Sequence, residues 1–114
     1  MKGQALKGHL DLLVLAVLAD GPLHGYAVIE QLRERSADAF DLPEGTVYPV
    51  LHRLAGSGFL AGEWNESSGR RRRTYRLTDE GRVALQQQRS QWEQFTEAVS
   101  SVLKGGARPC PNPT

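Results

Sequence analysis

The stretch from Leu42 to Thr78 constrains the fold more than any other part of the chain, because it joins a helix pattern to a hairpin pattern. Apolar residues in its first half recur three and four positions apart, as on one face of a helix. They are Val47, Val50, Leu51 and Leu54. Pro43 suits the first turn of this helix, where its missing N–H group is not needed, and Gly56 and Gly58 supply the end. Pro49 lies inside the helix, where it removes one backbone donor.

The second half of the stretch predicts a β-hairpin. Phe59–Trp64 and Thr74–Thr78 are short segments rich in aromatic and β-branched residues, which is typical of strands. Asn65–Gly69 between them has the composition of a turn.

The arm that leaves this turn is strongly basic. Five of the chain's fourteen basic residues lie there, namely Arg70, Arg71, Arg72, Arg73 and Arg76. The whole chain has a net charge of only +1, so the basic charge is local. A run of charge is often a solvated face, and arginine on an edge strand also discourages aggregation of sheets. We favour phosphate binding, because the cluster follows a helix with a polar, non-acidic face and clustered arginine is typical of nucleic-acid binding.

Two further helices are predicted before this stretch. His9–Ala19 carries an apolar stripe, and its remaining leucines lie off that stripe, so this helix is expected to be buried on two sides, partly against another subunit. Gly25–Arg35 is the second helix. Tyr26 in its first turn can help to bind a phosphate there, and simple packing is the alternative. The connection Ser36–Asp41 is longer than the turn of a minimal helix-turn-helix, which favours a winged variant.

The last predicted helix begins after Thr78, a suitable N-cap, and continues to about Lys104. A helix of roughly 25 residues is about 38 Å long, more than a small domain needs to cover. One face has a heptad pattern with a single polar interruption. We therefore predict a homodimer through this face, with intramolecular packing as the alternative. The predicted interface residues are Leu85, Gln88, Trp92, Phe95, Val99 and Val102.

Length and composition exclude several classes of protein. At 114 residues the chain is expected to be one folded unit, with a winged domain over 1–78, a dimerisation helix over 79–104 and a disordered tail over 105–114. Its single cysteine, Cys110, excludes an internal disulfide and a cysteine-based zinc site. The three histidines have no metal-binding spacing, and no glycine-rich phosphate loop is present, so we expect neither an enzyme nor a cofactor. No signal peptide or membrane span is predicted, which fits a cytoplasmic protein.

Three motifs together resemble those of the PadR family of transcriptional regulators, over about Leu10 to Leu103. They are Leu23–Tyr26 (LHGY), Gly45–Leu54 (GTVYPVLHRL) and Arg71–Gly81 (RRRTYRLTDEG). The chain departs from the family at Arg70, where a second glycine or a proline is frequent. The resemblance implies a mainly α-helical winged helix-turn-helix with a small β-hairpin and a long C-terminal helix. It also implies a dimer, usually a repressor, and in some members a flat aromatic ligand near the dimer centre.

These inferences predict that the protein binds double-stranded DNA. A two-fold dimer would bind an inverted repeat whose half-sites lie about 10 bp apart. The predicted DNA-binding residues are Tyr26, Thr46, Tyr48, Pro49, His52, Arg53, Arg70, Arg71, Arg72 and Arg73. Trp92 and Phe95 are the candidates for binding a small aromatic ligand, and their alternative role is to pack the dimer interface. The alternative for the whole chain is a winged-helix module that binds a protein partner instead of DNA.

Overall fold

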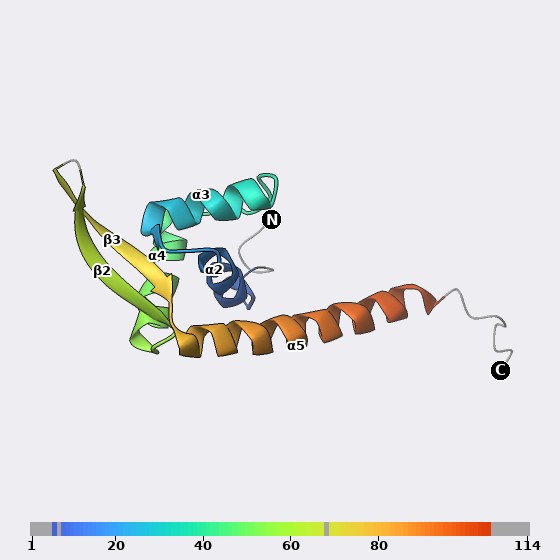
Figure 1. Cartoon of the computed structure of the whole chain (residues 1–114). Coiled ribbons are helices and arrows are strands. Elements are labelled where there is room, and N and C mark those ends of the chain that lie inside the picture. The colour runs from blue at the N-terminus through green and yellow to red at the C-terminus, as the bar shows by residue number, and fades with distance from the viewer. Residues whose placement is uncertain (1–5, 7, 68, 106–114) are drawn as a thin grey trace, which may run out of the picture.

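The computed structural model describes residue 6, residues 8–67 and residues 69–105, and within them a mainly helical chain with one small sheet (Figure 1). The predicted tail lies outside these residues, except for Gly105, and so does Cys110. The elements in chain order are α2 (Leu10–Leu18), β1 (Leu23–His24), α3 (Gly25–Arg35), α4 (Glu44–Gly56), β2 (Leu60–Ser67), β3 (Arg70–Leu77) and α5 (Asp79–Leu103). None of the described helices is both long enough and apolar enough to cross a membrane.

The core forms where the apolar stripes of α2, α3 and α4 meet. Its most deeply buried side chains are Val14, Leu15, Leu18, Val28, Val47, Leu51 and Leu54. The stripe predicted for α4 is therefore correct, and Pro49 leaves this helix continuous from Glu44 to Gly56. α2 contacts α3, α4 and α5, so the apolar surface expected on two of its sides is largely covered within its own chain (Figure 1).

The sheet is larger than the predicted hairpin. β3 pairs antiparallel with β2 on one side and with the two-residue strand β1 on the other. The predicted turn over Asn65–Gly69 is too long, since Ser67 already pairs with Arg70. Gly69 has a φ of +77°, a backbone conformation that glycine adopts without strain. The arginines therefore lie within a paired strand, and the predicted start of that strand at Thr74 is wrong.

The junction between β3 and α5 is fixed by hydrogen bonds at Thr78. Its hydroxyl accepts a bond of 3.0 Å from the backbone N–H of Gly81, which confirms the predicted N-cap, and donates one of 2.6 Å to the carbonyl of Gly58. A Cβ at Gly81 would collide with the carbonyl oxygen of Phe59. The start of α5 is thus held tightly against the loop that precedes β2.

α5 belongs to the domain core only at its start. Ala84 and Leu85 are buried there, whereas the described residues from Arg89 onward are exposed, and the C-terminal part of the helix extends beyond the other elements (Figure 1). Leu85 therefore packs inside its own chain. The exposed apolar face of α5 begins beyond it, with Trp92, Phe95, Val99 and Val102.

Candidate nucleic-acid interface

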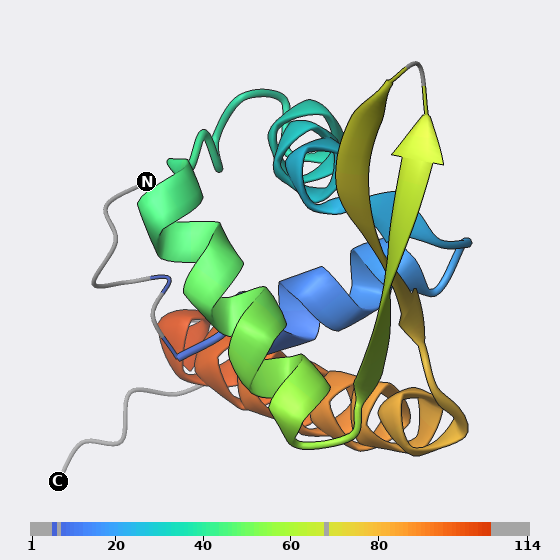
Figure 2. The same ribbon diagram turned by 90° about the vertical axis from the view of Figure 1, so that its left-hand side faces the viewer.

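A concave surface lies between the start of α3, the helix α4 and the hairpin of β2 and β3, which we call the wing. In Figure 2, α4 and the wing flank this face and come together where α4 leads into β2. The surface encloses a cavity of about 450 Å³. Its lining includes seven of the ten predicted DNA-binding residues, namely Tyr26, Tyr48, His52, Arg70, Arg71, Arg72 and Arg73.

Tyr48 connects α4 to the start of α3. A Cβ at Gly25 would lie only 2.8 Å from the Cε1 atom of the Tyr48 ring, so the ring packs where only glycine leaves room. Burial, followed by the carboxylate of Glu44 and the neighbouring tyrosines, raises the pKa of Tyr48 above its usual value. A tyrosine hydroxyl is protonated at neutral pH and can donate a hydrogen bond to an anionic ligand.

The other predicted residues of α4 lie outside this cavity. Thr46 and Pro49 are exposed on the helix surface. Arg53 is exposed as well, but its Nη1 and Nη2 atoms donate hydrogen bonds of 3.0 and 2.7 Å to the two carboxylate oxygens of Asp11 in α2. This pairing raises the pKa of Arg53. A contact between Arg53 and DNA would have to compete with Asp11, which the sequence did not indicate.

The pleat of β3 divides the arginines of the wing between two faces. Successive side chains of a strand point to opposite sides of the sheet. Arg71 and Arg73 share the face of Tyr75 and Leu77, which are buried in the core further along the strand. Arg70 and Arg72 start from the opposite face, and their long side chains still reach the cavity lining.

Trp64 of β2 is a site residue that sequence analysis did not identify. The register pairs it with Arg73, and the guanidinium carbon of Arg71 lies 4.7 Å from the centroid of its ring. The corresponding distance for Arg73 is 5.5 Å. The only sequence signal was an aromatic residue in a strand close to a run of arginines, since the register that joins them was not predictable from either segment alone.

The arginines of β3 are available for an external anion. In the described part of the chain the ion pairs are Arg33–Asp38, Arg35–Asp20 and Arg53–Asp11, and none of them involves β3. His24 lies next to these arginines, and its Nδ1 atom is 3.1 Å from the hydroxyl of Thr74. This hydrogen bond ties the start of α3 to the wing and helps to fix the shape of the concave surface.

Comparison with known proteins identifies the family of a chain with this geometry. Residues 14–87 match the model of the transcriptional regulator PadR-like family. The chain belongs to the PadR-like family. This membership confirms the predicted assignment to a family of DNA-binding transcriptional regulators and the expectation that the protein is not an enzyme.

Individual relatives agree with this assignment. The transcriptional regulator Rv3488 of Mycobacterium tuberculosis is 37% identical over 86 residues, which cover 75% of this chain and 78% of that protein. A PadR family regulator from Eggerthella lenta superimposes with a TM-score of 0.78 at 33% identity, over 88% of this chain and 86% of that one. A transcriptional regulator from Clostridium thermocellum has a TM-score of 0.80 at 25% identity, with 89% and 96% covered. These structures confirm the predicted winged-helix fold class.

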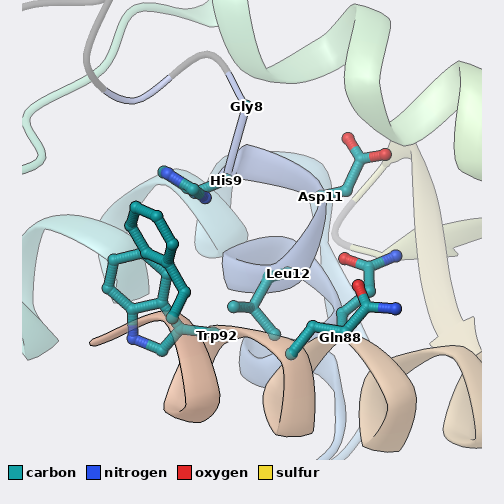
Figure 3. Close-up of a pocket in the computed structure, with 8 residues that line it drawn as sticks. Gly8, His9, Asp11, Leu12, Gln88 and Trp92 are labelled. Carbon is teal, nitrogen blue, oxygen red and sulfur yellow. The ribbon is translucent and has the colours of Figure 1, made fainter. Parts of the chain in front are cut away.

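A second cavity of this PadR-family chain, also of about 450 Å³, lies between the start of α2 and the exposed face of α5 (Figure 3). The ring of Trp92 meets that of His9 edge to face, with centroids 4.7 Å apart, and lies 6.0 Å from the ring of Phe95. Gln88 also lines this cavity. The two predicted ligand-binding residues are therefore brought together beside a cavity.

Proposed function

We propose that this PadR-family protein is a sequence-specific repressor that binds an inverted-repeat operator as a homodimer. The observation that carries the proposal is the concave surface between α4 and the wing. It combines the exposed polar face of a helix with arginines that form no ion pair among the described residues. Such a surface matches the shape and charge of duplex DNA, in which phosphates supply affinity and base edges supply sequence.

In this proposal α4 enters the major groove. Thr46, Tyr48 and His52 present hydroxyl and imidazole groups on its exposed side, and Pro49 offers an apolar contact to a thymine methyl group. Arg53 can reach a guanine or a phosphate once it separates from Asp11. The wing holds the flanking phosphates or the minor groove through Arg70, Arg71, Arg72 and Arg73, with Tyr26 at the edge of the same surface.

Dimerisation is assigned to the far part of α5. Trp92, Phe95 and Val99 are exposed along a single face, and a second copy of the same helix would cover them. Gln88 and Val102 lie at the two ends of this face. A dimer of this kind places two copies of α4 on one side of the DNA, about one helical turn apart.

The cavity beside Trp92 and Phe95 is the proposed site for an uncharged, flat aromatic ligand. The rings of His9 and Trp92 supply apolar surface, and the amides of Gln88 and Gln91 supply donors and acceptors. Such a ligand changes DNA affinity only if it binds two arrangements of the dimer unequally.

The test is binding of the purified protein to DNA from upstream of its own gene, titrated against salt. We expect tight, sequence-preferring binding by the wild type, because several phosphates are neutralised at once. Arg71→Ala/Arg72→Ala should lower the affinity by about tenfold or more and reduce the slope of log affinity against log salt by about 1.8.

The matched control is Arg82→Ala/Arg89→Ala, which removes the same charge from α5, away from the concave surface. It should leave the salt slope nearly unchanged. Binding no tighter than to random DNA, or equal effects of the two double variants, would contradict the proposal and favour a winged-helix module with a protein partner. Such a module should also elute from heparin at low salt.

A further inference from the structure

The wing contains an exposed tryptophan whose neighbours are cations. Trp64 is 54% exposed, which is unusual for so large an apolar ring. The guanidinium groups of Arg71 and Arg73 both lie over this ring, at 4.7 and 5.5 Å from its centroid. These distances are within the range of a cation–π interaction. The ring therefore draws together two like charges that would otherwise repel each other.

The backbone around Trp64 is shaped to hold Arg73. A Cβ at Gly62, two residues earlier in β2, would lie 2.5 Å from Nε and 2.8 Å from Nη2 of Arg73. The guanidinium thus occupies the space that a side chain at Gly62 would fill, as expected where a strand glycine permits close approach. Tyr75 lies beyond it, with its ring centroid 5.5 Å from the guanidinium carbon of Arg73. We call Gly62, Trp64 and Tyr75 the arginine cradle.

The arginine cradle contacts arginines on only one of the two faces of β3. Arg70 and Arg72 start from the opposite face, and no described aromatic ring lies under either guanidinium. Both are exposed, as is Arg71, whereas Arg73 is half-buried and its Nε atom is buried without a hydrogen-bond partner. The side chains of Arg71 and Arg73 are therefore held by aromatic rings, whereas no described ring holds those of Arg70 and Arg72.

We propose that Trp64 is a positioning residue for DNA binding, which holds Arg71 and Arg73 ready for a backbone phosphate. The proposal rests on the proposed function. It states which arginines of the wing are already held in place before they bind a phosphate of DNA. Stacking uses the flat face of a guanidinium and leaves N–H groups at its edge free to donate to phosphate oxygens. Because a stacked side chain has already lost much of its rotamer freedom, less is lost on binding. A phosphate would also relieve the repulsion between the two cations.

The test is a double-mutant cycle on the DNA that the wild type binds. We expect Trp64→Ala to weaken binding about fivefold and Arg71→Ala about tenfold. The double variant should lose clearly less than the roughly fiftyfold expected of independent effects, because without Arg71 only Arg73 remains for Trp64 to position. The control pairs Trp64→Ala with Arg72→Ala, which removes the same charge from the other face. There the two losses should multiply.

Two conservative variants separate positioning from packing. Trp64→Phe keeps an aromatic face and should retain binding within about twofold, whereas Trp64→Leu keeps apolar bulk without a π system and should bind as weakly as Trp64→Ala. Thermal unfolding of each variant shows whether the fold is intact, and Trp64→Leu replaces Trp64→Ala in the cycle if the alanine variant unfolds. Multiplicative losses in both cycles, or equal binding by the Phe and Leu variants, would overturn the proposal. Failure of the wild type to bind any DNA would instead contradict the proposed function.

Discussion

The two tryptophans of this chain lie in contrasting regions of its surface. Trp64 in the wing and Trp92 on α5 are 54% and 39% exposed, and each lies beside a cavity of about 450 Å³. Arg71 and Arg73 stack on Trp64, whereas His9 and Phe95 lie against Trp92. An exposed aromatic ring alone therefore does not distinguish the two regions.

The charge around each ring indicates which partner it suits. The ring in the wing lies among cations that lack a carboxylate partner in the described chain, and this environment favours an anionic polymer. The ring on α5 lies beside apolar groups and neutral amides, and the apolar face continues along the helix through Val99. The one carboxylate among the described residues that line its cavity, that of Asp11, is paired with Arg53. This second environment favours another copy of the helix or an uncharged ligand. DNA and the second subunit are thus expected at separate places.

The largest effect is expected from a charge placed on the apolar face of α5, where the second subunit is proposed to bind. Val99→Glu should convert the proposed dimer to a monomer, because each copy would have to bury a carboxylate in the apolar face of α5. DNA affinity should fall by about tenfold or more, since the two halves no longer bind together. Sedimentation and DNA titration measure the two effects. Gln94→Glu adds the same charge on another side of α5, and a similar loss of dimer there would argue against the assigned face.

A smaller effect is expected at the junction that holds the two regions in place. Thr78→Ala removes the N-cap of α5 and the hydrogen bond to Gly58, so the free energy of unfolding should fall by about 1 kcal/mol. Chemical denaturation measures it. Thr96→Ala removes a hydroxyl that only bonds to the carbonyl of Trp92 within α5. If Thr96→Ala is destabilised as much as Thr78→Ala, the loss does not come from the cap of α5 or the bond to Gly58.

The smallest predicted effect concerns the ion pair between Asp11 of α2 and Arg53 of α4. Asp11 lines the cavity of Trp92 and points from α2 toward α4, where it holds Arg53 (Figure 3). Because exposed ion pairs contribute little, Asp11→Asn should change stability by less than about 1 kcal/mol. It should raise DNA affinity by about two- to fivefold by freeing Arg53.

The gain should disappear in Asp11→Asn/Arg53→Ala, if Arg53 contacts DNA. Asp20→Asn is the matched control, because it frees Arg35 on α3 instead. An equal gain in the control would show that the loss of negative charge is responsible, and not the release of Arg53.

Local patterns were sufficient to predict most of the helices. The bounds of α3 agree with the prediction, and Thr78 caps α5 as expected, since both depend on residues close in sequence. β1 was not predicted, because two residues carry no strand pattern and Leu23 is extended only through its pairing with Tyr75. The predicted strand begins only at Thr74 for a similar reason, since the strand conformation of the arginines before it depends on cross-strand partners.

The sequence predicted the positive charge of the site but not which side chains contact each other there. The arginine run was visible in sequence, but the role of Trp64 required the register of β2 and β3. The pairing of Arg53 with Asp11 joins residues 42 positions apart on two different helices, which periodicity cannot show. Leu85 continued the heptad pattern of α5, and only the position of the helix against the core showed that it is buried within the chain.

The most direct test of the comparison follows each tryptophan separately. Trp92→Phe leaves Trp64 as the only tryptophan, and Trp64→Phe leaves Trp92. Quenching of fluorescence by acrylamide is then measured with and without operator DNA, at a protein concentration that maintains the dimer. DNA should protect Trp64 strongly and leave Trp92 unchanged. Protection of Trp92 with no effect on Trp64 would contradict the assignment of DNA to the wing and of the second subunit to α5.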